Sequence, residues 1–506
     1  MEIVLKIATA VAAFAFAACV LPLKQYQLAY YRLGETFTAL CRRKGEAIIL
    51  PLAVSVIAAV GAVLSAAFGF YPNFVSVGLG AVVTFSVCFP RSRLKKSKVA
   101  VTARVRRFLF AYLALCGLFG VAAYFLPAVA AVPACGSVAA FLLAHAVRTP
   151  IEAARNARFI DEAKEKLDRI NPIRIGITGS YGKTTFKSVL AVILSEKYRV
   201  CVSRGNFNTP LGLARTIKES MTEDAEIFVA EAGARHTGDI AELAELIRPD
   251  YAVVTAIGNQ HLETFGSIAN LKNEKFEIVV ALRDKGNAFF GSAAGELYRR
   301  NGKGYAAGAN VFAENVKAKD GGTYFTARIG NTVIPLYTKL GGDFIPETVA
   351  LAAAVALRLG VPPESIKKSV ARLNSVAHRQ QLLYNGLDVI IDDAYNANEA
   401  GARSALRLLG GFRGKTRVLV TPGIVELGIS QYDANYELGA YAASRADVMI
   451  FIGSNARALA SGAESGGAAK TAVFEVGSLK AATEILKNIK GERAILFEND
   501  LPDNYR

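Results

Sequence analysis

The sequence has no tryptophan, and methionine, histidine and cysteine are scarce, with 3, 4 and 6 copies in 506 residues. The cysteine positions show no pair with the spacing of a zinc site or a redox dithiol. This excludes both kinds of site and fits a reducing compartment. Intrinsic disorder is also excluded, because 52% of the residues are hydrophobic and only 20% are charged. A chain of this length can hold several domains without disulfide staples.

Acidic residues are scarce in the first 150 positions, which contain 3 of them against 15 lysines and arginines. The remaining chain is nearly balanced, with 44 basic and 40 acidic residues. A nucleic-acid-binding protein carries its basic excess on a folded binding face. This charge distribution therefore argues against a nucleic-acid partner.

The first 150 residues are instead interpreted as a membrane region. Two basic segments, 24–44 and 91–107, separate apolar runs of about the 17–25 residues that cross a bilayer as a helix. Because basic loops stay cytoplasmic, five spans place the N-terminus outside and residues 151–506 inside. A cleaved signal peptide at 5–23 is the alternative for the first run, but further apolar runs follow it. The sequence thus predicts a multi-pass plasma-membrane protein, with membrane lipid as a partner and its catalytic domains in the cytoplasm. The five expected spans are 5–23, 47–70, 73–90, 108–126 and 128–147.

Beyond an amphipathic stretch at Ile151–Ile170, short β-branched strands alternate with helices, which is typical of doubly wound α/β domains. An irregular stretch at 287–340 and an Ala-rich helix at Thr348–Leu359 separate two such series. The domains are therefore expected at 1–150, 151–375 and 376–506. The expected strands are Ile173–Thr178, Ile227–Glu231, Tyr251–Thr255, Thr323–Ile329, Thr332–Thr338, Asp388–Asp392, Arg417–Thr421, Val448–Ile452 and Ala494–Glu498.

A glycine loop follows the strand at Ile173–Thr178 and runs into a helix that begins Lys-Thr-Thr. Backbone N–H groups of such a loop cradle phosphates, a lysine neutralises them, and a threonine hydroxyl reaches Mg²⁺. An ordinary strand–turn–helix does not explain a lysine and two threonines at these offsets, although the strict motif would have glycine where Ile177 stands. The predicted ATP-binding residues of the loop are Gly179, Ser180, Tyr181, Gly182, Lys183, Thr184 and Thr185.

The run Thr178-Gly-Ser-Tyr-Gly-Lys-Thr-Thr185 resembles the nucleotide loop of the Mur ligase superfamily, and further motifs continue the resemblance over about 171–506. They resemble most the branch that adds D-alanyl-D-alanine. The resemblance implies a P-loop ATP-binding central domain and a Rossmann-like C-terminal domain behind the helical membrane anchor. The motifs are Gly205-Asn-Phe-Asn-Thr-Pro-Leu-Gly212, Glu231-Ala-Gly-Ala234, His261-Leu-Glu-Thr-Phe-Gly-Ser267, Glu274-Lys-Phe-Glu-Ile278, His378-Arg379, Asp392-Asp-Ala-Tyr-Asn-Ala-Asn398 and Gly423-Ile-Val-Glu-Leu-Gly428.

The resemblance also assigns roles to individual residues. Glu231 ends a buried strand beside the phosphate loop, where a carboxylate can hold Mg²⁺, and the alternative is a solvated strand-end acid. His261 is implied to bind a second Mg²⁺, with a structural histidine as the alternative. Lys275 is implied to be carbamylated and to bind Mg²⁺ through its new carboxylate, with a solvated helix lysine as the alternative. The implied sets are Lys183, Lys275, His261 and Glu231 for catalysis; Thr184, Glu231, His261 and Lys275 for metal; Arg379 and Asp393 for ATP; and Asn206, Asn208, Thr209, Tyr395, Asn396 and Asn398 for substrate.

The implied reaction is ATP- and Mg²⁺-dependent amide formation through an acyl phosphate, on a UDP-linked or lipid-linked cell-wall precursor. The amino substrate is an amino acid or D-alanyl-D-alanine. Family members usually have a UDP-binding domain where the apolar runs stand here, which favours a membrane-borne acceptor. At Gly342–Thr348, residues Phe344, Ile345 and Thr348 replace the family's histidine and two asparagines near the adenine. Competing hypotheses are an ATPase-coupled transporter, disfavoured because the apolar runs lack buried acids, and an inactive precursor-binding scaffold.

Overall fold

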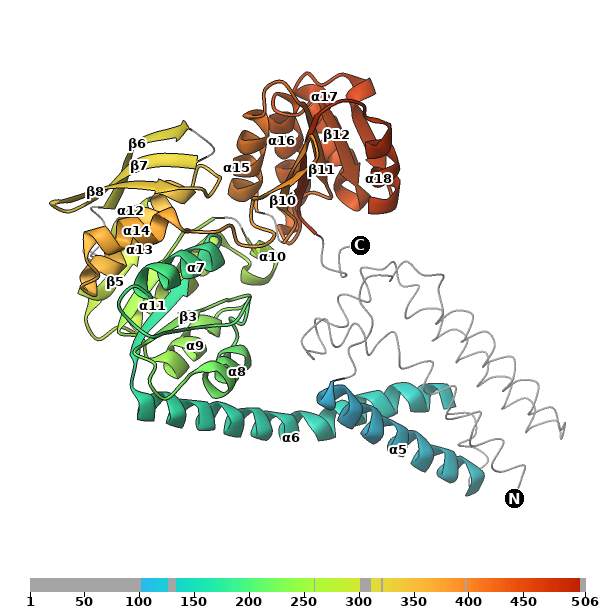
Figure 1. Cartoon of the computed structure of the whole chain (residues 1–506). Coiled ribbons are helices and arrows are strands. Elements are labelled where there is room, and N and C mark those ends of the chain that lie inside the picture. The colour runs from blue at the N-terminus through green and yellow to red at the C-terminus, as the bar shows by residue number, and fades with distance from the viewer. Residues whose placement is uncertain are drawn as a thin grey trace. The chain divides into compact units, whose positions relative to one another are not determined.

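The computed structural model describes residues 102–125, 133–258, 260–300, 311–319, 322–395 and 398–500. The chain divides after Ala157 into two compact units, and each is taken by itself. The second unit, residues 158–501, contains the α/β part of the chain (Figure 1).

Two helices, α5 (Ala103–Phe125) and α6 (Pro133–Ile170), are described in the first unit, and α6 continues beyond the unit's end. The buried carboxylate of Glu152 on α6 joins them. Arg107 of α5 donates to both of its oxygens, each at 2.9 Å, and Arg148 adds a bond of 2.6 Å to Oε1. Three charge-assisted bonds therefore satisfy this carboxylate, and the two from Arg107 hold α5 against α6.

The predicted membrane region is corrected here. Within the residues that the structure describes, no helix is both long enough and apolar enough to cross a membrane. α5 starts among arginines, and α6 runs without a break from the expected span 128–147 into a charged segment. The predicted localisation as a multi-pass plasma-membrane protein is contradicted by this finding. The expected spans 5–23, 47–70 and 73–90 lie outside the described residues.

A parallel sheet of five strands, in the order β2-β3-β1-β4-β5, forms the middle of the second unit. Its central strand β1 pairs with β3 on one side and β4 on the other, so that Ile177 lies opposite both Glu231 and Val253. The carboxyl ends of these three strands thus lie next to one another. The strands are β1 (Ile173–Thr178), β2 (Val200–Val202), β3 (Ile227–Glu231), β4 (Tyr251–Val254) and β5 (Ala288–Phe290).

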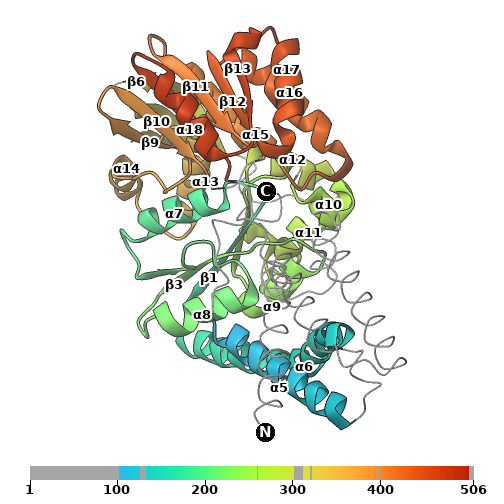
Figure 2. The ribbon, with the colours of Figure 1, turned by 90° about the vertical axis from the view of Figure 1, so that its right-hand side faces the viewer.

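Helices cover both faces of this sheet (Figures 1 and 2). Alternate strand residues such as Ile175 and Val229 pack with α7 and α13 in one core, while Phe228 and Val254 pack with α8, α9 and α11 in a second core. Strands buried on both faces read as continuous apolar runs, which explains why they were recognised in the sequence. The helices are α7 (Lys183–Leu194), α8 (Pro210–Ser220), α9 (Asp239–Ile247), α10 (Leu262–Phe265), α11 (Ile268–Val280) and α12 (Ser292–Arg300).

An antiparallel sheet in the order β6-β7-β8 follows, and its buried face packs on α13. The stretch 287–340, which looked irregular in the sequence, thus contains this three-stranded sheet. The elements are β6 (Val311–Lys319), β7 (Gly322–Ile329), β8 (Thr332–Thr338), α13 (Ile345–Arg358) and α14 (Pro363–Ala371).

The last part of the chain forms a six-stranded sheet in the order β13-β12-β11-β14-β10-β9, in which only β9 is antiparallel to its neighbour. Helices α15, α16 and α17 cover one face and α18 covers the other. The elements are β9 (Gln381–Asn385), β10 (Asp388–Asp393), α15 (Glu399–Gly410), β11 (Thr416–Thr421), α16 (Gln431–Ala443), β12 (Val448–Ile452), α17 (Ala456–Ser465), β13 (Val473–Val476), α18 (Leu479–Asn488) and β14 (Arg493–Glu498).

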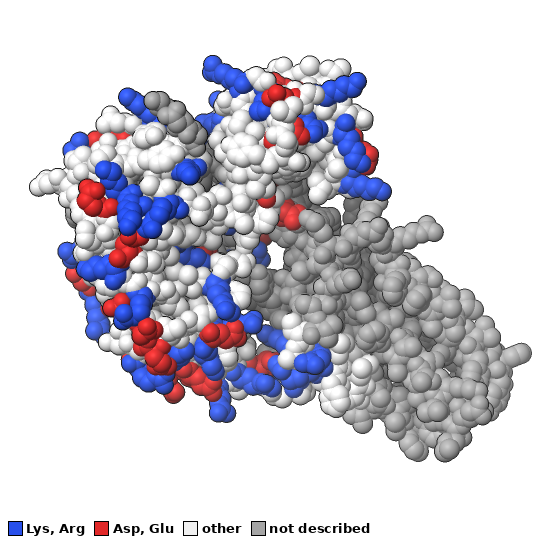
Figure 3. Space-filling view, in the orientation of Figure 1, with Lys and Arg blue, Asp and Glu red and all other residues white. Residues whose placement is uncertain are grey.

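Charges of both signs are interspersed on the face shown in Figure 3, where lysines and arginines lie beside acidic side chains. Among the described residues, exposed ion pairs include Arg169 with Glu223 at 2.7 Å and Arg328 with Glu314 at 2.8 Å. On this face the basic residues do not gather into a continuous stripe, which agrees with the balanced charge of residues 151–506.

Candidate active site

The phosphate loop connects β1 to α7, and two glycines give it its shape. Gly179 and Gly182 have φ angles of 146° and 79°, and a Cβ on Gly179 would lie 2.2 Å from Thr255 Oγ1. Ser180 fixes the loop to the segment after β4, since its N–H donates to Ala256 O at 2.7 Å and its hydroxyl to Gly258 O at 3.0 Å. Gly182 precedes α7 without a side-chain cap. The first N–H groups of α7 are therefore suited to an anion.

Lys183 begins α7, and its ammonium lies over the loop. It donates to Gly179 O at 2.6 Å and is 3.4 Å from Ser180 O. Burial lowers the pKa of Lys183, Arg379 adds to this effect, and Glu231 opposes it. The lysine is thus held where phosphates would meet the loop.

Glu231 lies at the end of β3 and is 1% exposed. Its Oε2 accepts a hydrogen bond from Thr184 Oγ1 at 3.0 Å and pairs with Lys187 Nζ at 3.1 Å. Burial acts to raise the pKa of Glu231, but Lys187, then Lys183, and the hydrogen bonds outweigh it, so the pKa is lowered. The carboxylate is therefore kept charged inside the protein.

The sequence reasoning missed Lys187. This buried lysine lies one helical turn after Lys183, and besides Glu231 it contacts Ser203 Oγ at 3.3 Å and Gly205 O at 2.6 Å. It therefore connects the phosphate-loop helix, Glu231 and the loop at 205–209. The signal in the sequence was a second lysine on the same helix face, four positions after the first.

Thr184 and Glu231 supply two adjacent oxygens beside the phosphate loop, which are the hard donors that Mg²⁺ prefers. In the described part of the chain, no three or more His, Cys, Asp or Glu side chains gather as a metal cluster. Mg²⁺ commonly takes one or two protein oxygens and completes its shell with phosphate oxygens and water. The residues present fit a metal bound together with a nucleotide.

The predicted substrate residues of the 205–209 loop have separate local roles. Asn208 Nδ2 donates to Glu231 Oε1 at 3.3 Å, and Thr209 Oγ1 caps α8 by accepting from Gly212 N at 3.3 Å. Asn206 is exposed. Only Asn208 of the three therefore touches the predicted catalytic residues.

Lys275 lies on α11 and is 2% exposed, whereas Lys272 one turn earlier is half-buried. Burial and then the nearby charge of Lys183 lower the pKa of Lys275 to about 7, against weaker opposing effects of Glu274 and Asp239. The neighbouring Glu274 is buried too, but it is occupied by Gly238 N and Ile240 N at 2.8 and 2.6 Å. Lys275 is thus the buried lysine of this helix, beside Lys183.

His261 follows β4 and has a left-handed backbone with φ of 54°. Its ring Nδ1 contacts the carboxylate of Glu426, a residue of the C-terminal sheet region. Burial lowers the pKa of His261; the contact with Glu426 opposes this, while Arg235 and Lys275 add to it. The neutral ring is therefore favoured near Lys275.

Arg379 and Asp393 come together near the start of the C-terminal sheet. The Arg379 guanidinium stacks over the Tyr395 ring at 4.1 Å, and burial lowers its pKa. Burial raises the pKa of Asp393 to about 6, although Arg379 opposes this. Asn398 caps α15 by accepting from Gly401 N at 3.0 Å, and Asn396 lies outside the described residues.

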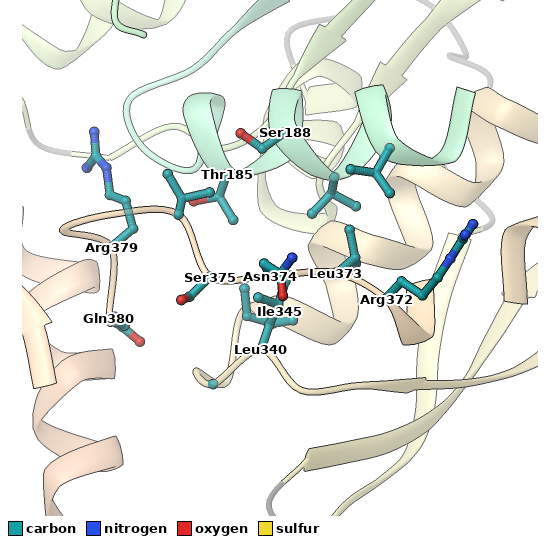
Figure 4. Close-up of a pocket in the computed structure, with 14 residues that line it drawn as sticks. Thr185, Ser188, Leu340, Ile345, Arg372, Leu373, Asn374, Ser375, Arg379 and Gln380 are labelled. Carbon is teal, nitrogen blue, oxygen red and sulfur yellow. The ribbon is translucent and has the colours of Figure 1, made fainter. Parts of the chain in front are cut away.

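A pocket of about 130 Å³ opens beside the phosphate-loop helix (Figure 4). Thr185 and Ser188 of α7 form one wall, and the segment 372–376 with Arg379 and Gln380 forms another. Ile345, one of the residues that departs from the family motif, lines this pocket. The Thr348 hydroxyl bonds back to Phe344 O at 2.9 Å. Ile345 thus places an apolar side chain in the pocket lining, at a position where the family motif has an asparagine.

The buried carboxyl group of Glu498, at the end of β14, leads us to expect that the free energy of unfolding depends on pH. Burial and then Asp393 raise its pKa to about 8 from the usual 4.5, and Thr421 Oγ1 donates to its Oε2 at 2.8 Å. Because the folded protein holds this proton more tightly than the unfolded chain, the stability that Glu498 contributes is fully present below about pH 4.5 and is lost as the pH rises through about 8. Glu498→Gln, which resembles the protonated acid, should raise the melting temperature at pH 9 by about 2–4 °C and change it little at pH 5.

Thermal unfolding of both proteins from pH 5 to 9 measures this difference. Glu464→Gln, an exposed site on α17, is the control and should leave the wild-type profile unchanged. Parallel profiles for wild type and Glu498→Gln would contradict the assignment.

The comparisons with known proteins agree with this geometry. The family model of the Mur ligase middle domain matches residues 177–356, and that of the Mur ligase glutamate ligase domain matches residues 378–498. The chain belongs to the Mur ligase family, whose members are ATP-dependent peptide ligases. The predicted class of enzyme, an ATP-dependent Mur-type acid–amino-acid ligase, is thereby confirmed.

Within the family, the chain is similar to UDP-N-acetylmuramoyl-tripeptide–D-alanyl-D-alanine ligases. It is 31% identical to that of Escherichia coli (strain K12), covering 64% of this chain and 75% of the relative. It is 34% identical to that of Bacillus subtilis (strain 168), covering 55% of this chain and 62% of the relative's length. The MurF ligase of Thermotoga maritima in complex with ADP has the same fold, with a TM-score of 0.60 and 24% identity over 68% of this chain and 80% of that one.

Proposed function

We propose that this chain is an ATP-dependent ligase that joins D-alanyl-D-alanine to the peptide of a UDP-linked muramoyl tripeptide. The names of the E. coli and B. subtilis relatives support this choice of substrates. One observation supports the chemistry above all others: Glu231, at the carboxyl end of β3, accepts a hydrogen bond at 3.0 Å from Thr184 of the phosphate-loop helix and pairs with Lys187 at 3.1 Å. Residues 151–375 would then form the ATP-binding domain and 376–506 the domain that closes over it.

ATP is proposed to lie with its phosphates on Gly179–Thr185. The loop glycines and the uncapped start of α7 present N–H groups, and Lys183 supplies the countercharge. Arg379 is proposed to approach the γ-phosphate and Asp393 the nucleotide. The pocket beside Thr185 adjoins this loop and Arg379, so it can take the remainder of the nucleotide.

Thr184, Glu231, His261 and Lys275 are proposed to hold Mg²⁺, with Lys275 as a carbamate. The carbamate forms when the Lys275 amine adds to carbon dioxide and releases a proton, and the buried lysine with its lowered pKa suits that step. Mg²⁺, when bound, offsets negative charge on the phosphoryl oxygens. Lys187 keeps Glu231 charged and fixed, since it pairs with Oε2.

The proposed reaction has two steps. The acceptor carboxylate attacks the γ-phosphorus of ATP, the bond to ADP breaks, and an acyl phosphate results. The amine then attacks the acyl carbon, phosphate leaves, and the amine loses a proton as the amide forms. Lys183 stabilises the first step by its charge at the transferred phosphoryl group. Closure of the C-terminal part would exclude water from the acyl phosphate.

Mass spectrometry of the products tests this function. Full-length protein is incubated with ATP, Mg²⁺ and the UDP-linked tripeptide, together with D-alanyl-D-alanine or one of several single amino acids. We expect an amide product and an equal amount of ADP with the dipeptide only. A parallel reaction with a lipid-linked acceptor tests the other carrier considered from the sequence.

Two results would contradict the proposal. If the amide forms only on the lipid-linked acceptor, the acceptor is lipid-linked and the proposed UDP-linked substrate is wrong. If ATP is hydrolysed without amide in every reaction, the protein is not a ligase of these substrates. Lys367→Ala, an exposed residue of α14, is the matched control for variants of the buried lysines and should react like wild type.

A further inference from the structure

Glu426 lies in the loop after β11 and reaches two side chains that follow strands of the middle sheet. Its Oε1 pairs with Arg235 Nη2 at 3.2 Å, and its Oε2 contacts His261 Nδ1. Arg235 follows β3 and His261 follows β4. A single carboxylate from the loop after β11 thus contacts the two loops that follow β3 and β4 in the five-stranded sheet.

The backbone at Glu426 has an unusual conformation between two buried neighbours. Its φ is 66°, in the left-handed region that side chains other than glycine seldom adopt. The flanking Val425 and Leu427 are buried, while the Glu426 side chain is 15% exposed. The two buried neighbours fix the loop and project the carboxylate out of it. Such strain persists where the surrounding structure holds it and is concentrated at functional sites.

The contact with Nδ1 determines what the rest of the His261 ring can do. A neutral imidazole carries its proton on one nitrogen and a lone pair on the other. When Nδ1–H donates to a carboxylate, the lone pair is on Nε2, which is the arrangement of metal-binding histidines whose second nitrogen is held by an outer carboxylate. Arg235 holds Glu426 in place for this role, because its guanidinium pairs with the other oxygen at 3.2 Å.

We propose that Glu426 is a positioning residue that fixes the tautomer and orientation of His261 and so links metal binding in the middle part to the approach of the C-terminal part. The inference rests on the proposed function, in which His261 binds the metal. Its consequence is that affinity for the metal–nucleotide pair depends on a residue that does not itself touch the metal.

The test uses full-length protein and Mn²⁺ as the probe, with free Mn²⁺ measured by electron paramagnetic resonance in the presence of ADP. Glu426→Ala should weaken Mn²⁺ binding by about 10- to 100-fold, the usual cost of losing an outer-shell partner. Glu426→Gln keeps an acceptor for Nδ1–H without the charge and should fall between wild type and Glu426→Ala. Glu464→Gln, exposed on α17 of the same domain, is the control and should bind like wild type.

A double-mutant cycle separates positioning from general support of the fold. In a His261→Ala background, Glu426→Ala should cause no further loss of Mn²⁺ affinity, because the side chain that it orients is gone. The inference is overturned if Glu426→Ala and Glu426→Gln bind Mn²⁺ like wild type, or if Glu426→Ala causes the same loss in both backgrounds. Wild-type protein that binds no Mn²⁺ with ADP, yet forms the amide with Mg²⁺, would overturn the inference alone. If the wild-type protein neither binds Mn²⁺ with ADP nor forms the amide with Mg²⁺, the proposed function is wrong as well.

Discussion

Lys183→Ala is expected to reduce amide formation and ADP release by at least about 100-fold, below detection in a routine assay. The lysine ammonium is the positive charge nearest the loop carbonyls of Gly179 and Ser180, at 2.6 and 3.4 Å. Removal of a preorganised group that stabilises developing charge costs on the order of 10²–10³ in rate. A quenched-flow assay of ADP formation, in the presence of both substrates, measures the loss directly.

Two comparisons make this result specific. Lys367→Ala removes an exposed lysine and should leave the rate of amide formation unchanged. The melting temperature of Lys183→Ala without nucleotide should stay close to that of wild type, because among the described residues its ammonium donates to carbonyls of its own loop, and Lys187 still pairs with Glu231. ADP should stabilise the variant less than it stabilises wild type, since binding to the folded state alone raises stability. Turnover near the wild-type rate would contradict the assignment of the phosphate site.

Lys275→Ala is expected to remove most activity and to be partly rescued by small carboxylates. A charged lysine has no lone pair to offer a metal, whereas a carbamate presents two oxygens. The side chain is 2% exposed, so its loss leaves a space on the inner face of α11 that acetate or formate can enter. Alanine suits a helix interior, and the fold should be retained. Initial rates measured over a series of formate concentrations would show the effect.

The neighbouring Lys272 is the matched control for Lys275. It lies on the same helix but is half-buried, and Lys272→Ala should be close to neutral. Depletion of bicarbonate should lower the wild-type rate and leave that of Lys275→Ala unchanged. An active Lys275→Ala variant, or a sensitive Lys272, would show that the carbamate assignment is wrong.

Much of the α/β architecture was predictable, because buried parallel strands leave continuous apolar runs. The ranges of β1, β3, β8 and β12 agree with the expected ones to the residue, and β10, β11 and β14 each differ by one residue at one end. Short strands were missed: β2 and β5 have three residues each and β13 has four. The strands β6 and β9 were missed too, because few of their described residues are buried and they lack the alternating burial that reveals β8.

The site was predictable where one motif carries it and not where distant residues meet. Lys183, Thr184 and Glu231 come together as expected, and their roles stay predictions until tested. Lys187 and Glu426 were missed, since each acts through a partner chosen by the fold: Glu231 for the first, His261 for the second. Pairing across about 45 and 165 positions leaves no periodic signal in a single sequence.

The membrane hypothesis depended on apolar composition and charge asymmetry alone. Those quantities describe the transfer of side chains out of water, and they do not reveal which helices pack on one another. In the described part of the first unit, the half-buried Arg107 and Arg148 form an ion cluster with the buried Glu152, and Arg107 joins α5 to α6. Such a cluster forms only when residues 45 positions apart in the chain meet in space. The hydropathy of successive segments does not show this contact.

The strand order β2-β3-β1-β4-β5 has a consequence for how the protein acquires its activity. The phosphate loop follows β1, Glu231 ends β3, and His261 follows β4. The site therefore does not exist until β1 has paired with both β3 and β4. Such non-local pairings form slowly, because the loops between them must close first. Partly folded chains therefore have no place for the triphosphate, and nucleotide cannot speed the early steps of folding. Its contribution comes afterwards, by mass action on the completed sheet.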